Sequence, residues 1–315
     1  MIKLTILDGR AVNPGDLPWD FLKKYADITV YERTSPEQVI ERICNSDAIL
    51  INKTPITQQI LDACPNLKYI GVLATGYNVV DLDATRKRGI VVTNIPAYST
   101  DSVAQHVFSF ILYFTNQVAQ HSESVMNGEW IKCRDFCFWN SSLSELTGKT
   151  LGIFGYGHIG SRVAQIGKAF GMNIICCTRT PKPDMPPAVS FEELLKCSDF
   201  LTLHAPLTPQ TTNIINKNTL ALMKPTAYLI NTARGGFIVE KDLADCLNAG
   251  GIAGFAADVL LKEPMAADNP LLGAKNCIIT PHIAWAPYET RKRLQGIAEE
   301  NLKAWLAGKP INVVS

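Results

Sequence analysis

The segment GYGHIG at residues 155–160 restricts the fold of this chain more than any other feature. It matches G-x-G-x-x-G, a pattern that carries weight only when it joins a strand to a helix. Here the apolar run 151–154 precedes it, and Val163, Ile166 and Phe170 follow it at helical spacing. Such glycines allow a tight turn and a close backbone approach to a pyrophosphate at the helix N-terminus. The motif predicts a dinucleotide-binding unit. The residues expected at the cofactor are Gly155, Gly157, His158, Ile159 and Gly160.

Apolar strands and amphipathic helices alternate on both sides of this motif. Ahead of it, strands are expected at 4–7, 28–30, 48–51, 69–73 and 91–94, with helices at 18–24, 36–44 and 57–63. Beyond residue 150, strands are expected at 151–154, 173–177, 200–203, 227–231, 253–258 and 276–280, with helices between them. Such alternation predicts parallel sheets with helices on their faces. We therefore predict an α/β chain with two Rossmann-like, doubly wound parallel-sheet domains.

Two long helical segments indicate where the domains divide. Residues 99–116 are apolar nearly all round but short and interrupted, which predicts a buried helix rather than a membrane span. Residues 287–306 form an amphipathic helix beyond the last strand, so we expect this helix to return to the first domain. The predicted boundaries are 1–98 plus 288–315 for one domain and 99–287 for the other.

An aromatic cluster lies between the long helix and the glycine motif. The segment 133–139 contains Phe136, Phe138 and Trp139. Such a cluster is typical of a protein core or of a contact between two copies of a chain, rather than of a ligand cage. Both alternatives stay open from the sequence.

Charge and cysteine content exclude several classes of function. The 30 basic and 29 acidic residues give a formal net charge of +1, which provides no electrostatic footprint for nucleic acid or an anionic membrane. The nine cysteines lack metal-binding spacing, so we expect reduced thiols, no metal site and a cytoplasmic location. The segment MIKLTILDGR predicts a strand and a turn rather than a signal peptide.

Three polar residues follow three of the predicted strands: Arg234, Glu263 and His282. In a doubly wound parallel sheet, the loops after the strands open on one edge, where the glycine turn also holds the dinucleotide. Taken singly, each residue has a structural alternative: a surface arginine, a turn glutamate or a histidine at a strand end. Their shared edge favours a catalytic site beside the nicotinamide.

These residue types suit hydride transfer to the carbonyl of a 2-oxoacid. The oxygen that becomes a hydroxyl needs a proton, which His282 can supply near neutral pH. A carboxylate at Glu263 would orient the imidazole and favour its protonated form. The planar guanidinium of Arg234 can bind both the substrate carboxylate and the carbonyl oxygen. The cofactor would supply the hydride.

At these residues the chain strongly resembles the D-isomer-specific 2-hydroxyacid dehydrogenases. The matching segments, which span essentially the whole chain, are GYGHIG, LTLHAPLTPQTTNII, LINTARGG, AADVLLKEP and ITPHIAW. The resemblance implies a central NAD(P)-binding domain inserted into a smaller, flavodoxin-like substrate domain made from both chain ends. It also implies a homodimer with a dimerisation segment at about 99–145. In the family, the Arg binds substrate, the His is the acid/base and the Glu pairs with the His; these roles carry over to Arg234, His282 and Glu263.

The resemblance further implies ligand contacts in several loops. Backbone amides of Ala74, Thr75 and Gly76 would bind the substrate carboxylate; the alternative is an ordinary glycine turn. Asp258 would face the nicotinamide amide. The remaining implied cofactor contacts are Thr100, Val103, His204, Ala205, Pro206, Thr232, Ala233, Arg234 and His282. For His204, a satisfied histidine at a strand end is the alternative.

Within the family, the run GVLATGYNVVDLDATRKRGIVVTNIPAYSTDSVAQ is most similar to glycerate dehydrogenases, also called hydroxypyruvate reductases. This similarity favours reduction of hydroxypyruvate to D-glycerate, or of glyoxylate to glycolate. A D-lactate-type dehydrogenase is the nearest alternative. A non-catalytic, corepressor-like protein that senses dinucleotides is the alternative from another functional class.

The end of the second strand after the glycine motif departs from the usual NAD pattern. An NAD-specific site has an Asp or Glu there to hold the ribose hydroxyls. This chain has Thr178, Arg179 and Thr180 instead, so no carboxylate repels a 2′-phosphate and Arg179 can pair with it. We expect NADP(H) to be accepted and mildly favoured over NAD(H). The alternative is that Arg179 stacks on the adenine and NAD still binds.

Overall fold

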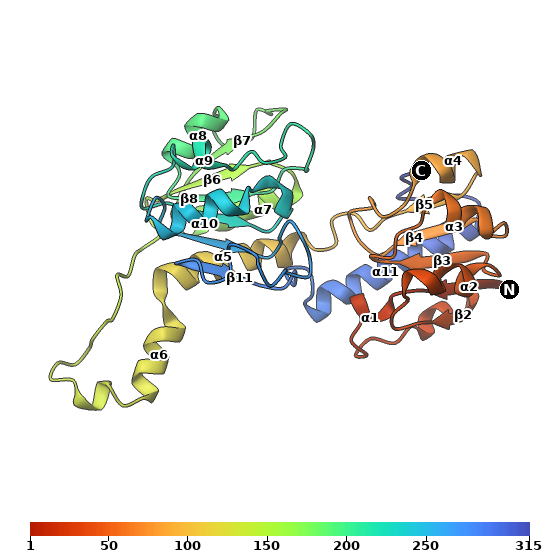
Figure 1. Cartoon of the computed structure of the whole chain (residues 1–315), viewed down its shortest axis with the longest axis horizontal. Helices are drawn as coiled ribbons and strands as arrows, with labels where there is room; N and C mark the ends of the chain where they lie inside the picture. The colour runs from red at the N-terminus through yellow and green to blue at the C-terminus, as the bar shows by residue number, and fades with distance from the viewer. The chain divides into compact units, whose positions relative to one another are not determined.

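The computed structural model describes all 315 residues, which divide into two compact units (Figure 1). The first unit comprises Met1–Ser99 and Ala286–Ser315, and the second comprises Thr100–Trp285. Each unit is built around one parallel sheet, so the chain is an α/β protein with two doubly wound domains. None of its helices is both long and apolar enough to cross a membrane.

The sheet of the first unit has five parallel strands in the order β2-β1-β3-β4-β5. These strands are β1 (Ile2–Ile6), β2 (Ala26–Val30), β3 (Ala48–Ile51), β4 (Tyr69–Val72) and β5 (Val91–Thr93). Every residue of β3 and β4 is buried, which is why both read as continuous apolar runs. The strand order reverses between β1 and β3, as in flavodoxin-like sheets.

Five helices belong to the first unit: α1 (Gly9–Val12), α2 (Val39–Ile43), α3 (Gln58–Ala63), α4 (Leu82–Lys87) and α11 (Tyr288–Leu306). The last of them packs on β4, where Trp305 stacks on Tyr69 with ring centroids 4.8 Å apart. Beyond α11, Val313 pairs with Thr93 of β5. The C-terminal residues therefore complete the unit that the first 99 residues begin.

The sheet of the second unit has six parallel strands in the order β11-β10-β9-β8-β6-β7. They are β6 (Thr150–Phe154), β7 (Asn173–Cys177), β8 (Phe200–Leu203), β9 (Tyr228–Asn231), β10 (Gly254–Ala257) and β11 (Cys277–Ile279). The order reverses between β6 and β8. This switch point is where doubly wound sheets bind dinucleotides, outside the carboxyl ends of the strands.

Helices cover both faces of the second sheet. They are α5 (Thr100–Asn116), α6 (Val118–Met126), α7 (His158–Ala169), α8 (Phe191–Cys197), α9 (Lys217–Leu220) and α10 (Glu240–Asn248). One apolar cluster joins α5 and α7 to the sheet, and a second joins α8 and α10 to it. Nine residues of α5 are buried, in agreement with its apolar sequence.

The aromatic cluster at 133–139 lies on the surface of this chain. It follows α6, which extends away from the sheet of its own unit (Figure 1). Phe136 is 88% exposed and Trp139 is 66% exposed. The core alternative for this cluster is therefore wrong, and a contact between two copies of the chain stays a prediction.

The structure differs from the sequence expectations mainly at short helices. Helix α4 was not foreseen, although Asp81 marks its start and accepts a hydrogen bond from the backbone of Ala84 at 2.9 Å. The helix expected at 18–24 reduces to a 3₁₀ turn at Asp20–Leu22. The helix expected at 36–44 begins as a 3₁₀ turn before α2. Short segments carry too few apolar repeats for periodicity to fix their bounds.

Candidate active site

The glycine turn between β6 and α7 is closed on the sheet side and open at the helix start. Gly155 has φ +95°, a conformation that favours glycine, and a Cβ there would lie 2.3 Å from Ala205 N. A Cβ at Gly160 would lie 2.2 Å from the Gly155 carbonyl oxygen. Gly157 is the N-cap of α7, and a Cβ there would meet no atom within 4 Å. A pyrophosphate can therefore approach the first N–H groups of α7.

Two buried polar atoms at the same edge of the sheet have no hydrogen-bond partner within the protein. They are Nδ1 of His204, which follows β8, and Oγ1 of Thr232, which follows β9. His204 uses its other nitrogen, Nε2, which lies 2.8 Å from Thr202 Oγ1. Burial lowers the pKa of His204 to about 3, so its imidazole is neutral at pH 7. Unpaired buried atoms at this sheet edge fit a bound ligand that supplies their partners.

The end of β7 presents an exposed cation. Thr178 is partly buried, while Arg179 and Thr180 are exposed. The next carboxylate along the chain is Asp184. This strand end therefore fits a phosphate or a ribose without repelling either. Together with the glycine turn, it gives the residues that would hold a dinucleotide.

The other expected cofactor residues occupy different environments. Thr100 starts α5, and Val103 is buried in the same helix. His158 is exposed and Ile159 is partly buried in the first turn of α7. Pro206 is exposed beyond β8. Their contacts with a cofactor stay predictions.

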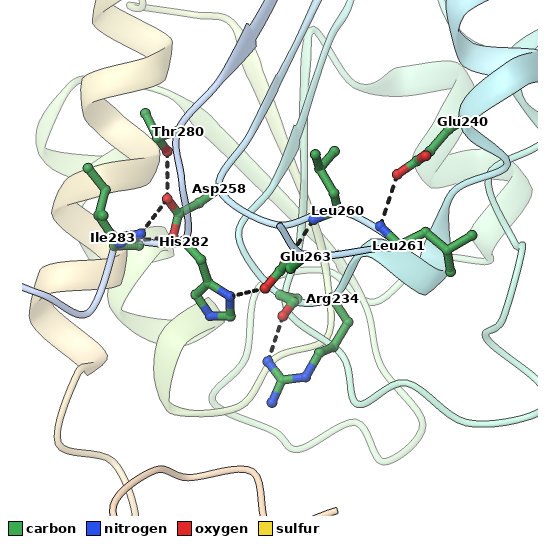
Figure 2. Close-up of polar contacts among 11 residues, drawn as sticks. Arg234, Glu240, Asp258, Leu260, Leu261, Glu263, Thr280, His282 and Ile283 are labelled. Carbon is green, nitrogen blue, oxygen red and sulfur yellow. Dashed lines mark hydrogen bonds and ion pairs between the residues drawn. The ribbon is translucent and has the colours of Figure 1, made fainter. Parts of the chain in front are cut away.

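His282 and Glu263 form a close pair at the carboxyl edge of the sheet. His282 Nδ1 lies 2.6 Å from Glu263 Oε2, and Figure 2 shows the two side chains pointing toward each other. The side chain of His282 is 28% exposed and that of Glu263 is 35% exposed. A histidine that donates Nδ1–H to a carboxylate keeps Nε2 for a substrate. The pair therefore has the geometry of an oriented acid/base.

Arg234 lies in the loop after β9, and this loop packs directly on the loop that leads to Glu263. Its guanidinium is exposed, and Nη1 donates to the Ala233 carbonyl oxygen at 2.7 Å (Figure 2). A Cβ at Gly235 would lie 1.9 Å from the carbonyl carbon of Leu260. Only glycine permits this approach, so the two loops can pack in contact.

Glu240 fastens the loop that carries Glu263. Its Oε1 accepts from Leu261 N at 2.9 Å, and its Oε2 accepts from Asn269 Nδ2 at 2.8 Å. Glu263 itself accepts from Leu260 N through Oε1 at 3.0 Å, which leaves Oε2 for His282 (Figure 2). Sequence reasoning missed Glu240, whose only signal was a carboxylate at a helix N-terminus.

Asp258 holds the loop that carries His282. Its side chain is 1% exposed. It accepts from Ile283 N at 2.8 Å, from Ala284 N at 2.8 Å and from Thr280 Oγ1 at 2.5 Å (Figure 2). A carboxylate can accept about four hydrogen bonds, so these three use most of its capacity. The expected contact of Asp258 with a nicotinamide amide stays a prediction beside this observed role.

The expected substrate loop lies in the first unit, where two asparagines hold it from both sides. Asn52 Nδ2 donates to the Leu73 carbonyl oxygen at 2.7 Å, and Asn94 Nδ2 donates to the Thr75 carbonyl oxygen at 2.8 Å. Ile95 N donates to the Ala74 carbonyl oxygen at 3.0 Å. The carbonyl oxygens are thus engaged. Sequence reasoning did not identify the two asparagines that bind them.

Comparison with known proteins agrees with the arrangement of the second unit. The family described as "D-isomer specific 2-hydroxyacid dehydrogenase, NAD binding domain" matches residues 108–284. The chain is 46% identical to hydroxypyruvate reductase of Blautia hydrogenotrophica over 100% of both chains. The chain belongs to the D-isomer-specific 2-hydroxyacid dehydrogenase family.

Two further similarities bear on the subgroup and the fold. Glycerate dehydrogenase of Methylorubrum extorquens is 38% identical, with 99% of this chain and 98% of the relative covered. The structure of an NADPH-dependent glyoxylate/hydroxypyruvate reductase from Sinorhizobium meliloti, in complex with NADP and malonate, is 29% identical with a TM-score of 0.84. That alignment covers 100% of this chain and 97% of the other. The family resemblance expected from the sequence is confirmed.

Proposed function

We propose that this protein is an NAD(P)-dependent reductase of small 2-oxoacids, which converts hydroxypyruvate to D-glycerate, glyoxylate to glycolate, or both. The observation that carries the proposal is the His282–Glu263 pair, 2.6 Å apart at the sheet edge that also holds the open glycine turn. The names of the similar hydroxypyruvate reductase and glycerate dehydrogenase support this choice of substrate.

The catalytic roles follow from the side chains at this edge. His282 donates a proton from Nε2 to the carbonyl oxygen during reduction and takes it back in the reverse reaction. Glu263 orients the ring through Nδ1 and stabilises its charged form. Arg234 binds the substrate carboxylate and carbonyl oxygen through its planar guanidinium. When bound, the nicotinamide cofactor supplies or accepts the hydride.

The first unit is proposed as the substrate domain and the second as the cofactor domain. In the first, the backbone amides of 74–76 would bind the substrate carboxylate. The carbonyl groups of this loop are already hydrogen bonded within the unit, and these bonds hold the loop in place. In the second, the glycine turn would hold the pyrophosphate. His204 and Thr232 would pair with the bound cofactor, because each has a buried polar atom in need of a partner.

For the cofactor, we propose that NADP(H) is mildly favoured over NAD(H). The support is the exposed Arg179 at the end of β7, in a segment without a carboxylate until Asp184. A 2′-phosphate would gain a charge-assisted hydrogen bond there. The similar reductase from Sinorhizobium meliloti is described as NADPH-dependent.

A homodimer and a cytoplasmic location complete the proposal. The segment 118–143 exposes several large apolar side chains, which a second copy of the chain would cover: Val118, Met126, Trp130, Ile131, Phe136, Trp139 and Leu143. The nine cysteines are all free thiols, as is usual in a reducing compartment.

The test is a substrate panel of hydroxypyruvate, glyoxylate and pyruvate, each with NADPH and NADH, followed by the absorbance of the reduced cofactor. We expect turnover with the first two substrates and at least a few-fold higher kcat/KM with NADPH. The Arg179→Ser variant, which removes the cation, should lower the preference for NADPH about tenfold. Pyruvate as the best substrate would indicate the D-lactate-type alternative. No turnover of any 2-oxoacid, with cofactor binding retained, would contradict the enzyme and indicate the dinucleotide-sensing alternative.

A further inference from the structure

The backbone conformation of His282 must be stabilised by contacts with other residues. Its φ is +56°, in the left-handed region where a side chain with a Cβ is disfavoured. The only backbone bond of its own N–H is to the Thr280 carbonyl oxygen at 2.9 Å, which closes a tight turn. A turn this small does not fix the ring by itself, so the surrounding contacts decide where Nε2 points.

Asp258 grips the backbone directly after His282. Its two carboxylate oxygens accept from two consecutive amides, those of Ile283 and Ala284, each at 2.8 Å. A buried carboxylate that accepts successive N–H groups fixes both the position and the rotation of the chain. These two hydrogen bonds fix the backbone position from which the His282 side chain extends.

A second set of hydrogen bonds connects Asp258 to helix α5. The single hydroxyl proton of Thr280 is donated to Asp258 Oδ1 at 2.5 Å. The oxygen of Thr280 is therefore an acceptor for His106 Nε2, which lies 3.0 Å away. His106 Nε2 also lies 3.6 Å from Asp258 Oδ1. The bonds run in one direction, from His106 through Thr280 to Asp258.

The ring of His106 is held in place for this contact. It packs edge-on against Phe110, one turn along α5, with ring centroids 4.6 Å apart. Burial lowers the pKa of His106, and the nearby carboxylate of Asp258 opposes this shift only in part. The neutral ring with its proton on Nε2 satisfies the observed distances, so the donor is in place at neutral pH.

We propose that His106 and Asp258 are positioning residues for His282, connected through the hydroxyl of Thr280. They fix the loop 280–284 and so aim His282 Nε2 at the reacting oxygen. The inference rests on the proposed role of His282 as acid/base. It assigns a task to His106, a partly buried polar side chain of α5 that the proposed function does not otherwise use.

The test compares Thr280→Val, which removes the hydroxyl with little change of shape, with His106→Leu and with the conservative His106→Gln. We expect Thr280→Val and His106→Leu each to lower kcat about tenfold with KM changed less than about twofold, because a misplaced acid slows the chemical step more than binding. His106→Gln, which can still donate from its amide, should recover most of the loss. In the protein without ligand, amide hydrogen exchange of 280–284 should rise about tenfold in the two disruptive variants.

Thr219→Val is the matched control. The hydroxyl of Thr219 is also hydrogen bonded, but to the backbone carbonyl oxygens of Ile214 and Asn216 near the start of α9. This control should lower stability without changing kcat or the exchange of 280–284. If Thr280→Val and His106→Leu keep full kcat and normal exchange while His282→Gln is inactive, the positioning proposal is overturned and the proposed function stands. If His282→Gln itself stays active, the acid/base assignment fails first.

Discussion

Each unit of the molecule uses one buried aspartate, just beyond a strand, to fasten the loop that follows the neighbouring strand. In the first unit, Asp8 follows β1 and accepts from the backbone N–H groups of 52–54, after β3, at 2.6–3.1 Å. In the second, Asp258 follows β10 and accepts from the N–H groups of 283 and 284, after β11, at 2.8 Å. Parallel neighbours end at the same edge, so a carboxylate on one strand end reaches the next loop.

The two loops differ in what they carry. The loop held by Asp258 contains His282, the proposed acid/base. The loop held by Asp8 contains Asn52, whose side-chain amide donates to the Leu73 carbonyl oxygen. This bond links the loop to the proposed substrate loop. The buried aspartate therefore fixes the loop of the proposed acid/base in the second unit. In the first unit it acts on the proposed substrate loop only through Asn52. The difference predicts separate kinetic effects: on kcat for the Asp258 region and on KM for the Asp8 region.

The largest expected effect tests whether the second-unit loop carries the chemistry. His282→Gln keeps an amide that can bond to Glu263 but cannot transfer a proton. We expect kcat for hydroxypyruvate reduction to fall about 10³-fold, with the affinity for NADPH changed little. Steady-state kinetics and cofactor fluorescence titration measure the two quantities. Retention of more than about a tenth of kcat would remove the contrast between the two loops.

A second expected effect separates the units by their response to acid. All five histidines lie between residues 100 and 285, so the first unit has none. The pKa of His204 falls to about 3 on folding, so only the unfolded chain takes up this proton as the pH drops below 6.5. His204 alone should therefore lower the unfolding free energy of the second unit by about 2 kcal/mol between pH 6.5 and 4.5.

Amide exchange at the two pH values, corrected for intrinsic rates, measures this loss in each unit separately. The His204→Gln variant should remove most of the difference, because its amide does not titrate. An equal loss in the first unit, or an unchanged loss in the variant, would show that groups other than His204 control the acid response.

The smallest expected effect tests the indirect role of Asp8. Asp8→Asn replaces one of the two acceptor oxygens with an amide nitrogen, which cannot accept from the N–H groups of 52–54. We expect KM for hydroxypyruvate to rise about tenfold with kcat within about threefold, equivalent to the loss of one or two hydrogen bonds in the substrate loop. Asp27→Asn, at an exposed position of β2, is the matched control and should leave both constants unchanged. A fall in kcat with normal KM would place Asp8 in the same class as Asp258.

Sequence reasoning located the residues that follow strand ends. In a parallel sheet these ends lie at one edge, so residues that follow different strands become neighbours in space. Arg234, Glu263 and His282 were therefore predicted at one edge, and the structure brings Glu263 and His282 within 2.6 Å. The doubly wound fold was also predicted and is confirmed. These inferences need only apolar runs, a glycine pattern and the order of elements.

The supporting contacts could not be predicted in this way. His106, in α5, reaches Thr280, just beyond β11, across 174 residues of sequence, and no periodicity encodes such a pair. The hydrogen bonds of Asp258 to the backbone of 283 and 284 depend on the left-handed φ of His282, which a histidine seldom adopts. Glu240 reads as an ordinary acidic residue in a first helical turn. Loop conformation decides these contacts, and local sequence fixes it only weakly.

The insertion of the second unit into the first has a consequence during synthesis. The first unit needs α11, whose Trp305 covers Tyr69, and α11 follows the second unit in the chain. At translation rates of roughly 5–20 residues per second, the ribosome takes about 10–40 s to make the intervening unit. Throughout that interval the apolar side of β4 lacks its last cover. The nascent chain therefore exposes this apolar surface until α11 is made, whereas the second unit is continuous in sequence and can fold as soon as its last strands have emerged.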